Sequence, residues 1–422
     1  MSIAGSQQRT LLELLGQLRP HWHRDRNLPA RIQNILARQR AFGARDRRLY
    51  RELIYTTLRY LPWVEHALDS DADWAVQLIA WLAADSPVTE HFRTAFLSGW
   101  PPCPPTVAEK TPIVAARFAP GEGAPGHAPS PDQLGSLLPE WFRTHCPEAF
   151  MPSQTNALLA RAPLWLRLQT GDAAPVIQEF ADLGWQWTPS GVLDSAWRVD
   201  ASINVTKSRA YEAGLIEIQD LGSQLLLESC SIVPGEHWLD ACAGAGGKTL
   251  QLAGLLGPKG RIDASDVRAD ALRELAARAA RAGIPVGPDS EHVSASAIPS
   301  AERGHARFAR RRISPASEVV SDGVLVDAPC SGSGTWRRAP HLKWTTLPSH
   351  IEAAAAKQWE LLSRFGDRVR PGGRLIYATC SLSRRENHDV VANFLASRTD
   401  FTVELAPKPF GGLQGATGLT FL

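Results

Sequence analysis

Two cysteines stand directly after two apolar runs. Cys330 follows Val-Leu-Val-Asp-Ala-Pro at 324–329, and Cys380, fifty residues later, follows Arg-Leu-Ile-Tyr-Ala-Thr at 374–379. Open α/β sheets bind ligands at the carboxyl ends of their strands, so two thiols placed alike after two strands predict one shared site. A thiol has an ordinary pKa near 8.5, and its surroundings must activate it before it acts as a nucleophile. Cysteine is also common in protein cores, which is the alternative interpretation.

A glycine-rich run lies earlier in the chain, at 240–249, and reads Asp-Ala-Cys-Ala-Gly-Ala-Gly-Gly-Lys-Thr. Glycines there allow a tight turn and let backbone amides approach a ligand at the positive end of a helix dipole. A Walker A loop would need glycine at Cys242, and the strict dinucleotide pattern would need glycine at Thr249. The run therefore predicts a nucleotide-like ligand other than a triphosphate. Asp266, at the end of the next strand, is placed to accept hydrogen bonds from a ribose, with a helix cap as the alternative.

Strands and helices must alternate from residue 220 onward to position these groups. We expect strands at 237–240, 261–266, 324–327, 374–379 and 401–405, and helices at 222–230, 248–256, 268–282, 350–369 and 384–397. Ser383 and Glu386 have the spacing of a capping box for the last helix. Repeated strand–helix units predict an α/β fold with a parallel, doubly wound sheet.

The first half of the chain has a different pattern. Residues 8–84 predict amphipathic helices, with Leu49, Leu53, Ile54 and Leu58 on the buried stripe of one of them. Residues 99–133 are rich in proline and glycine and predict a long connection without helix or central strand. Residues 138–219 contain an alternating strand at 164–168, a helical stretch and further short strands. This pattern predicts a small α+β module.

Composition narrows the class of protein. The chain has 422 residues, a net charge of +2 and six cysteines without framework spacing. It has no apolar run long enough to span a membrane and no signal-peptide core at the N-terminus, so we expect a cytoplasmic protein. The net charge excludes a globally basic binder, but 40–51 and 303–312 each hold five arginines. Such clusters either guide nucleic acid or form ordinary solvated faces.

The motifs together resemble a known family. Asp240 to Thr249, Asp327 to Thr335 with Arg337-Arg338 and Lys343-Trp344, and Ala378 to Ser381 with Glu386-Asn387 are similar, in that order, to the Sun/RsmB family of S-adenosylmethionine-dependent RNA cytosine-5 methyltransferases. Residues 28–55 resemble the NusB-like helical domain of bacterial members, and 163–168 with 218–224 resemble the family's small domain. The resemblance implies three parts: a NusB-like, all-α RNA-binding domain with a Pro/Gly-rich linker at 1–135, a small α+β module at 136–220, and a Rossmann-like class I methyltransferase domain at 221–422.

The resemblance also implies residue roles. Cys380 would add to carbon 6 of cytosine, which turns the ring into an enamine that attacks a methyl sulfonium, and Cys330 would assist release. DNA cytosine methyltransferases use a Pro-Cys nucleophile, so the reverse assignment is the alternative. Asp327 would contact the ring and the methionyl end of S-adenosylmethionine. Asp266 would hold the ribose, and no metal is implied. The loop would contact the methionine and ribose through Cys242, Ala243, Gly244, Ala245, Gly246, Gly247 and Lys248.

The chain departs from the family in three places. Gly244-Ala245 replaces part of the family's Ala-Pro-Gly-Gly-Lys, 293–297 lacks the aspartate that contacts adenine, and 418–422 stands where the family has a Gly-Phe-Phe-like strand. The second and third departures favour the alternative of a catalytically weakened RNA-binding or ribosome-assembly factor, whereas retention of Asp327, Cys330, Lys248 and Cys380 opposes it.

For an active enzyme, the resemblance implies small-subunit (16S) ribosomal RNA as substrate, with transfer RNA as the alternative. We expect a monomer, no membrane, and phosphate contacts from Arg337, Arg338 and Lys343 unless these are solvated loop charges.

Overall fold

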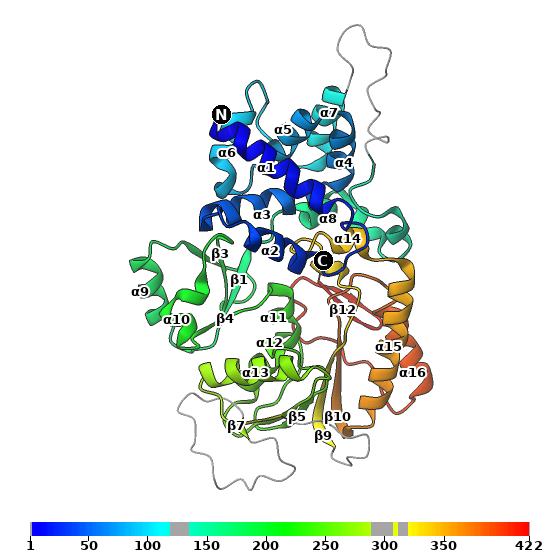
Figure 1. Cartoon of the computed structure of the whole chain (residues 1–422). Coiled ribbons are helices and arrows are strands. Elements are labelled where there is room, and N and C mark those ends of the chain that lie inside the picture. Colours follow the sequence, from blue (N-terminus) through cyan, green and yellow to red (C-terminus); the bar gives the residue numbers. More distant parts are fainter. Residues whose placement is uncertain (1, 119–134, 288–306, 311–319, 422) are drawn as a thin grey trace. The chain divides into compact units, whose positions relative to one another are not determined.

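The computed structural model describes residues 2–118, 135–287, 307–310 and 320–421 (Figure 1). It divides into two compact units. The helical unit comprises Met1–Ala162 with Gly332–His350, and the sheet unit comprises Pro163–Ser331 with Ile351–Leu422. This division differs from the three contiguous parts expected from the sequence, because the segment 332–350 belongs with the N-terminal helices and the small module shares a unit with the main sheet.

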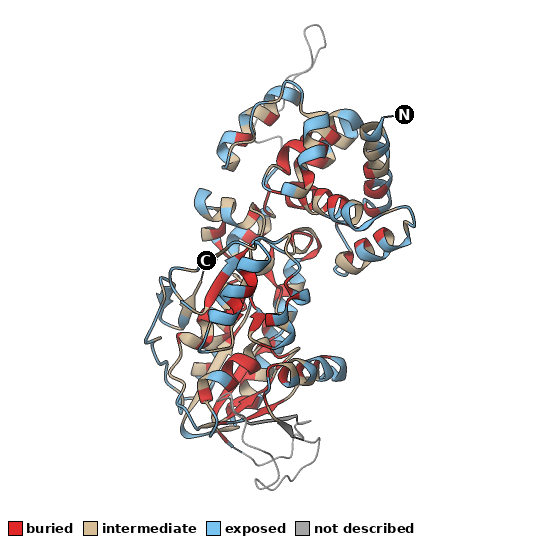
Figure 2. Ribbon diagram, turned by 90° about the vertical axis from the view of Figure 1, so that its left-hand side faces the viewer, coloured by how far each residue is buried: buried red, intermediate tan, exposed pale blue. Residues whose placement is uncertain are grey.

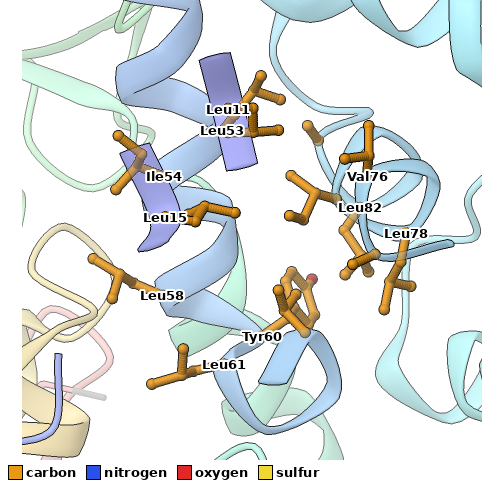
Figure 3. Close-up of a cluster of buried hydrophobic side chains, with 14 of the residues drawn as sticks. Leu11, Leu15, Leu53, Ile54, Leu58, Tyr60, Leu61, Val76, Leu78 and Leu82 are labelled. Atoms are coloured by element: carbon orange, nitrogen blue, oxygen red, sulfur yellow. The ribbon is translucent and has the colours of Figure 1, made fainter. Parts of the chain in front are cut away.

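Nine helices are assigned to the described part of the helical unit. They are α1 (Ile3–Leu18), α2 (Leu28–Arg38), α3 (Ala44–Arg59), α4 (Leu61–Ser70), α5 (Ala72–Leu82), α6 (Glu90–Phe96), α7 (Val107–Phe118), α8 (Pro152–Leu159) and α14 (Leu342–Thr345). The predicted stripe on α3 is confirmed, because Leu49, Leu53, Ile54 and Leu58 are all buried. They join leucines of α1 and α5 in one core, part of which is drawn in Figure 3.

Two expectations for this unit were wrong. The proline- and glycine-rich stretch was expected to contain no helix, yet α7 occupies Val107–Phe118 with Pro112 inside it. Lys343 was expected at RNA phosphates or in solvent, yet it is 1% exposed and donates hydrogen bonds to the carbonyls of Arg59 (2.8 Å) and Leu137 (3.2 Å). Burial lowers the pKa of Lys343 well below its ordinary value. Trp344 beside it donates to the carbonyl of Leu58, so the segment 332–350 supplies partners for the last carbonyls of α3.

The sheet unit holds the predicted parallel sheet. Its strand order is β10-β9-β5-β6-β8-β7, and every assigned pairing in it is parallel. The strands are β5 (His237–Asp240), β6 (Arg261–Ala264), β7 (Val286–Gly287), β8 (Arg307–Arg310), β9 (Ser321–Asp327) and β10 (Val369–Ala378). The helices of this sheet are α11 (Leu221–Glu228), α12 (Gly247–Leu256), α13 (Ala269–Arg281), α15 (Pro348–Gly366) and α16 (His388–Ser397).

Helices cover both faces of this sheet. Trp238 and Leu325 pack into a cluster with α12 and α13, whereas their strand neighbours Leu239 and Val324 pack with Phe365 of α15. Successive strand residues point to opposite faces, so strands buried on both sides are apolar throughout. Figure 2 shows this burial along the central strands. The doubly wound α/β fold expected from the sequence is therefore confirmed.

The small module is a second, antiparallel sheet of order β2-β3-β1-β4 within the same unit. Its strands are β1 (Leu164–Leu168), β2 (Trp187–Pro189), β3 (Ala196–Val199) and β4 (Ile216–Ile218), and its helices are α9 (Ala174–Asp182) and α10 (Arg209–Glu212). Val176 and Phe180 of α9 pack on Leu166 and Trp197 of the sheet. The predicted α+β character of this module is thus confirmed.

The last residues differ from expectation. The segment 401–405 forms no strand, and its Val403 and Leu405 are exposed. Residues 413–420 instead form a separate hairpin of β11 (Leu413–Gly415) and β12 (Gly418–Thr420). No helix in the described part of the chain is long and apolar enough to cross a membrane.

Candidate active site

Four neighbouring strands bring the candidate residues to one edge of the sheet. In the order β10, β9, β5, β6, their carboxyl ends lead into Cys380, into Asp327 and Cys330, into the glycine-rich loop, and into Asp266. The chain order reverses between β5 and β9, because β6 lies on one side of β5 and β9 on the other. Such a switch point is where open α/β sheets bind ligands. The predicted site residues therefore lie close together in the structure.

The glycine-rich loop turns tightly from β5 into α12. Gly246 has φ +89°, and a Cβ on it would lie 1.9 Å from Cδ1 of Leu275, so glycine is required at this position. Gly244 has φ +54°. The loop places several amides before the first turn of α12, where the helix dipole favours negative or electron-rich ligand groups. Burial raises the pKa of the Cys242 thiol to about 12, so Cys242 is not a thiolate nucleophile.

Asp266 lies beside this loop. Its carboxylate accepts hydrogen bonds from the amide of Gly244 (2.8 Å) and the amide of Arg268 (2.9 Å), and it also pairs with the Arg268 guanidinium. Burial alone would raise the pKa of Asp266, but the bonds from Arg268 and Gly244 bring it below its ordinary value. The neighbouring Val267 is 99% exposed. A carboxylate at the end of β6 with an exposed apolar side chain beside it has the groups that a nucleoside would need, and sequence reasoning had missed Val267.

Asp327 and Lys248 form an ion pair that joins the end of β9 to the first turn of α12. The Lys248 Nζ lies 2.7 Å from the Asp327 Oδ2. Asp240, the last residue of β5, is buried, and its carboxyl group accepts a hydrogen bond from the Thr249 hydroxyl (2.7 Å). Burial is the largest cause that raises the pKa of Asp240 to about 7; the charge of Asp327 also raises it, whereas the bond from Thr249 lowers it. The loop and the end of β9 are thus fixed relative to each other.

The two cysteines predicted to share a site lie in contact. Their Sγ atoms are 3.1 Å apart, longer than the roughly 2.05 Å of a disulfide bond. β9 and β10 are paired in register up to Asp327 and Ala378, which places the loops that follow them side by side. Cys380 is exposed and Cys330 is half-buried, so both thiols differ from buried core cysteines. A planar ring at this edge could meet a thiol and a carboxylate at once.

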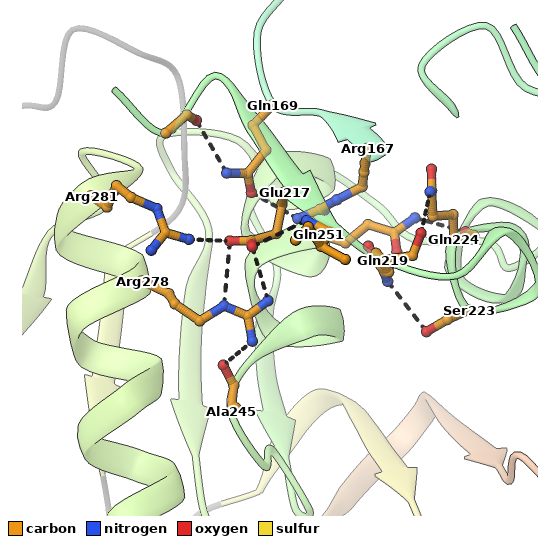
Figure 4. A network of polar contacts seen from close by, with 12 residues as sticks. Arg167, Gln169, Glu217, Gln219, Ser223, Gln224, Ala245, Gln251, Arg278 and Arg281 are labelled. Carbon is orange, nitrogen blue, oxygen red and sulfur yellow. Dashed lines mark hydrogen bonds and ion pairs between the residues drawn. The ribbon is translucent and has the colours of Figure 1, made fainter. Parts of the chain in front are cut away.

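A polar network formed by residues of α13 and β4 holds the glycine-rich loop, and sequence reasoning had missed it (Figure 4). Arg278 of α13 donates to the carbonyl of Ala245 (2.6 Å) and pairs with Glu217 of β4, which also pairs with Arg281. Glu217 is 1% exposed. The small module therefore reaches the loop through a buried carboxylate and one arginine. The i, i+3 spacing of the two arginines on one helix was the available signal.

Two expectations cannot be placed at the site. The stretch 293–297, where the adenine contact was sought, lies outside the described residues, as do most of residues 303–312. Lys343 is buried within the helical unit, as described above, whereas Arg338 is exposed. The described residues hold no group of three or more histidine, cysteine, aspartate or glutamate side chains arranged for a metal ion.

Sequence comparisons find relatives for most of the chain. Residues 229–418 match the model of the family described as 16S rRNA methyltransferase RsmB/F. The ribosomal RNA small subunit methyltransferase B of Xanthomonas campestris is 29% identical over 71% of this chain and 65% of the relative. That of Pasteurella multocida is 30% identical over 68% of this chain and 62% of the relative. The matched region thus spans less than two thirds of the length of these curated relatives.

Solved structures share the fold. The crystal structure of PH0851 superposes with a TM-score of 0.62 at 21% identity and covers 94% of this chain and 90% of that one. NSun6 from Pyrococcus horikoshii with SFG gives a TM-score of 0.53 at 18% identity, over 67% of this chain and 92% of that one. At these identities the likeness establishes the fold alone.

Proposed function

We propose, from the match of residues 229–418 to the family described as 16S rRNA methyltransferase RsmB/F and from the paired thiols, that the chain is a member of this family. In this proposal it transfers a methyl group from S-adenosylmethionine to carbon 5 of a cytosine in small-subunit ribosomal RNA. The observation that carries the proposal is the contact between Cys330 and Cys380, 3.1 Å apart at the carboxyl edge of the sheet. Two adjacent thiols suit a reaction in which a covalent adduct forms and is then resolved. The target base must be unpaired or flipped out to reach them.

The two cysteines divide the covalent chemistry. The Cys380 thiolate adds to carbon 6, so that the ring electrons collect at carbon 5, which becomes the nucleophile. After methylation, carbon 5 loses its proton and the Cys380 thiolate leaves by β-elimination, with Cys330 assisting at this step. This order rests on the family resemblance, because the distance between the thiols is the same whichever acts first. The reverse order is an outcome of the test below.

Asp327 acts on the ring during addition. Lys248 Nζ holds the Asp327 Oδ2 at 2.7 Å, and we assign Oδ1 to the polar edge of cytosine. Its side chain is 31% exposed, enough to touch a ligand. A preoriented group of this kind stabilises charge that develops as the thiolate adds.

The glycine-rich loop and Asp266 would hold the methyl donor. The required glycine at 246, the loop amides before α12, and the ribose-type acid at the end of β6 fit S-adenosylmethionine. Residues Cys242 to Lys248 would contact its methionine and ribose, and Val267 offers an apolar face for the base. When bound, S-adenosylmethionine supplies the electrophilic methyl group.

The helical unit would contact RNA. Five arginines of α2, α3 and the turn between them are exposed and give this face a concentrated positive charge: Arg38, Arg40, Arg45, Arg48 and Arg51. Exposed arginines bind phosphates without reading sequence, which suits a positioning part. We therefore assign this NusB-like part of the chain to docking of the RNA.

The test is methylation of 16S ribosomal RNA with radiolabelled S-adenosylmethionine, followed by mapping of 5-methylcytosine. Cys380→Ala is expected to abolish methylation, and Cys330→Ala to accumulate a covalent protein–RNA adduct. Cys103→Ala, a thiol of the helical unit, is the matched control and should retain activity. If the adduct accumulates with Cys380→Ala instead, the roles are reversed. RNA binding without methyl transfer by the intact chain would favour the assembly-factor alternative.

A further inference from the structure

One buried carboxylate connects the two cysteine loops. Glu386 is 0% exposed, and its side chain accepts four hydrogen bonds. Its Oε1 accepts from the amide of Ser331 (2.7 Å) and from Nε2 of Gln358 (3.1 Å). Its Oε2 accepts from the hydroxyls of Ser331 and Ser381, each at 2.5 Å. All three donor residues belong to the sheet unit.

The two serines directly follow the two cysteines. Ser331 comes after Cys330 and Ser381 after Cys380, and their hydroxyl oxygens are themselves 3.2 Å apart. Each loop is therefore held at the residue next to its thiol. A single side chain, Glu386, bridges the loops.

Further bonds make each loop rigid around this bridge. Gln358 of α15 also donates to the carbonyl of Pro329 (2.9 Å), the residue before Cys330. The Ser381 hydroxyl also accepts from the amide of Ser383 (3.0 Å), and Tyr377 donates to the Glu386 carbonyl (2.6 Å). The bridge thus connects two loops that each have their own internal support.

Helix capping does not explain this residue. The sequence placed Glu386 in a capping box with Ser383 for a helix that begins at 384, but α16 begins at His388 with Asn387 as its N-cap. A carboxylate at a capping position usually stays partly solvated, whereas burial of a charge is costly unless several donors compensate. Four donors from the cysteine loops and α15 supply that compensation here. Both loops are thereby bound to one carboxylate.

We propose that Glu386 is a positioning residue that holds the Cys330 and Cys380 thiols at reaction distance by bridging Ser331 and Ser381. In this role Glu386 itself makes and breaks no covalent bond. Its catalytic consequence rests on the proposed function, whereas its effect on the thiol pair does not. The two can therefore be measured separately.

The direct test needs neither RNA nor cofactor. Oxidised dithiothreitol forms a mixed disulfide with one protein thiol, and the second protein thiol then displaces dithiothreitol to close the protein disulfide. The two thiol protons and the two electrons pass to dithiothreitol, which leaves as the dithiol, and the rate of closure reports how often the two sulfurs meet. The measurement uses the full chain, with the Cys330–Cys380 peptide link quantified by mass spectrometry. Glu386→Ala is expected to slow this link at least tenfold. In Glu386→Gln the amide NH2 can donate to the two hydroxyl oxygens in place of the carboxylate that accepted from them, so this variant should recover part of the rate.

Matched variants separate positioning from folding. Glu352→Gln removes an exposed carboxylate of α15 that pairs with Arg385, and it should leave the rate unchanged. Ser381→Ala removes one of the four bonds and should give an intermediate rate even if Glu386→Ala fails to fold. The affinity for S-adenosylhomocysteine should stay within twofold of wild type in every folded variant. The reason is that the glycine-rich loop follows β5, whereas the cysteine loops follow β9 and β10. In methylation, kcat should fall while KM for S-adenosylmethionine stays constant.

The outcomes distinguish this proposal from the proposed function. Wild-type disulfide rates in folded Glu386→Ala and Ser381→Ala would overturn the positioning role, even if the chain methylates RNA. A tenfold slower rate in a chain that methylates no RNA would support the positioning role and refute the methyltransferase assignment. Failure of the wild-type chain to form the link faster than Cys103 pairs with any other cysteine would also overturn the proposal.

Discussion

The buried carboxyl group of Asp240 should make stability fall as pH rises. Burial raises its pKa from an ordinary 3.8 to about 7 in the folded chain. Between these two values the native state keeps a proton that the unfolded chain releases, so the free energy of unfolding falls by about 1.4 kcal/mol per pH unit. The stabilising contribution is complete below pH 4 and is lost as pH rises through 7. Over roughly three pH units the loss reaches about 4 kcal/mol.

Asp240→Asn isolates this contribution. The amide resembles the protonated carboxyl group, keeps an oxygen that accepts from Thr249, and does not titrate. Urea unfolding of both proteins at several pH values gives the difference between their free energies of unfolding, in which all other titrating groups cancel. We expect this difference to shift toward the variant by about 3 to 4 kcal/mol between pH 4.5 and 7.5.

A second carboxylate, that of Asp322, supplies a control in which the effect of pH on stability has the opposite sign. A hydrogen bond from the His237 amide and a bond from Arg370 lower the pKa of Asp322 below its ordinary value. Its contribution is therefore present above the unfolded pKa and is lost as pH falls, so wild type should gain over Asp322→Asn as pH rises. A difference between wild type and Asp240→Asn that stays constant across the whole pH range would refute the reasoning.

Three further changes test the cofactor side by calorimetric binding of S-adenosylhomocysteine. Gly246→Ala places a Cβ 1.9 Å from Leu275 at φ +89° and should weaken binding more than tenfold, whereas Gly222→Ala, with nothing within 4 Å, should not. Arg278→Met removes the bond to the Ala245 carbonyl. Because a charge-assisted bond of this kind contributes roughly 1.5 kcal/mol, the affinity for S-adenosylhomocysteine should fall about tenfold. Unchanged affinity would show that the loop needs no such support. Arg268→Ala removes the exposed guanidinium that pairs with Asp266 and that a bound ribose would have to displace. The affinity for S-adenosylhomocysteine should therefore rise up to about fivefold, and weaker binding would be the contrary result.

The parts of the site that could be predicted are those that local sequence determines. The Pro-Cys and Thr-Cys contexts, the glycine-rich run and Asp266 each lie at the end of an apolar stretch, and parallel strands bring such ends to one edge. That single rule was enough to predict that Cys330 and Cys380 share a site, which the structure confirms with their 3.1 Å contact.

What could not be predicted depends on partners far away in the chain. Glu386 has the spacing of a capping residue, and only the folded chain brings Ser331, 55 residues earlier, to its carboxylate. Glu217 and Arg278 are separated by 61 residues and had no shared motif. The alternation of apolar and polar residues at 401–405 shows that this segment could pair as a strand. A strand forms only where the edge of a neighbouring strand is available, and Val403 and Leu405 remain exposed.

Lys343 shows why the two compact units differ from the three contiguous parts expected from the sequence. Boundaries inferred from composition are contiguous, so a segment that follows the Pro-Cys motif was assigned to the catalytic domain. In the structure, Gly332–His350 belongs to the helical unit, where Lys343 and Trp344 donate to the last carbonyls of α3. A lysine amine is tolerated in a buried position only where fixed acceptors replace water, and backbone carbonyls at a helix end are such acceptors. A charge that looks like a phosphate contact in sequence is therefore explained by the end of a helix nearly three hundred residues earlier in the chain.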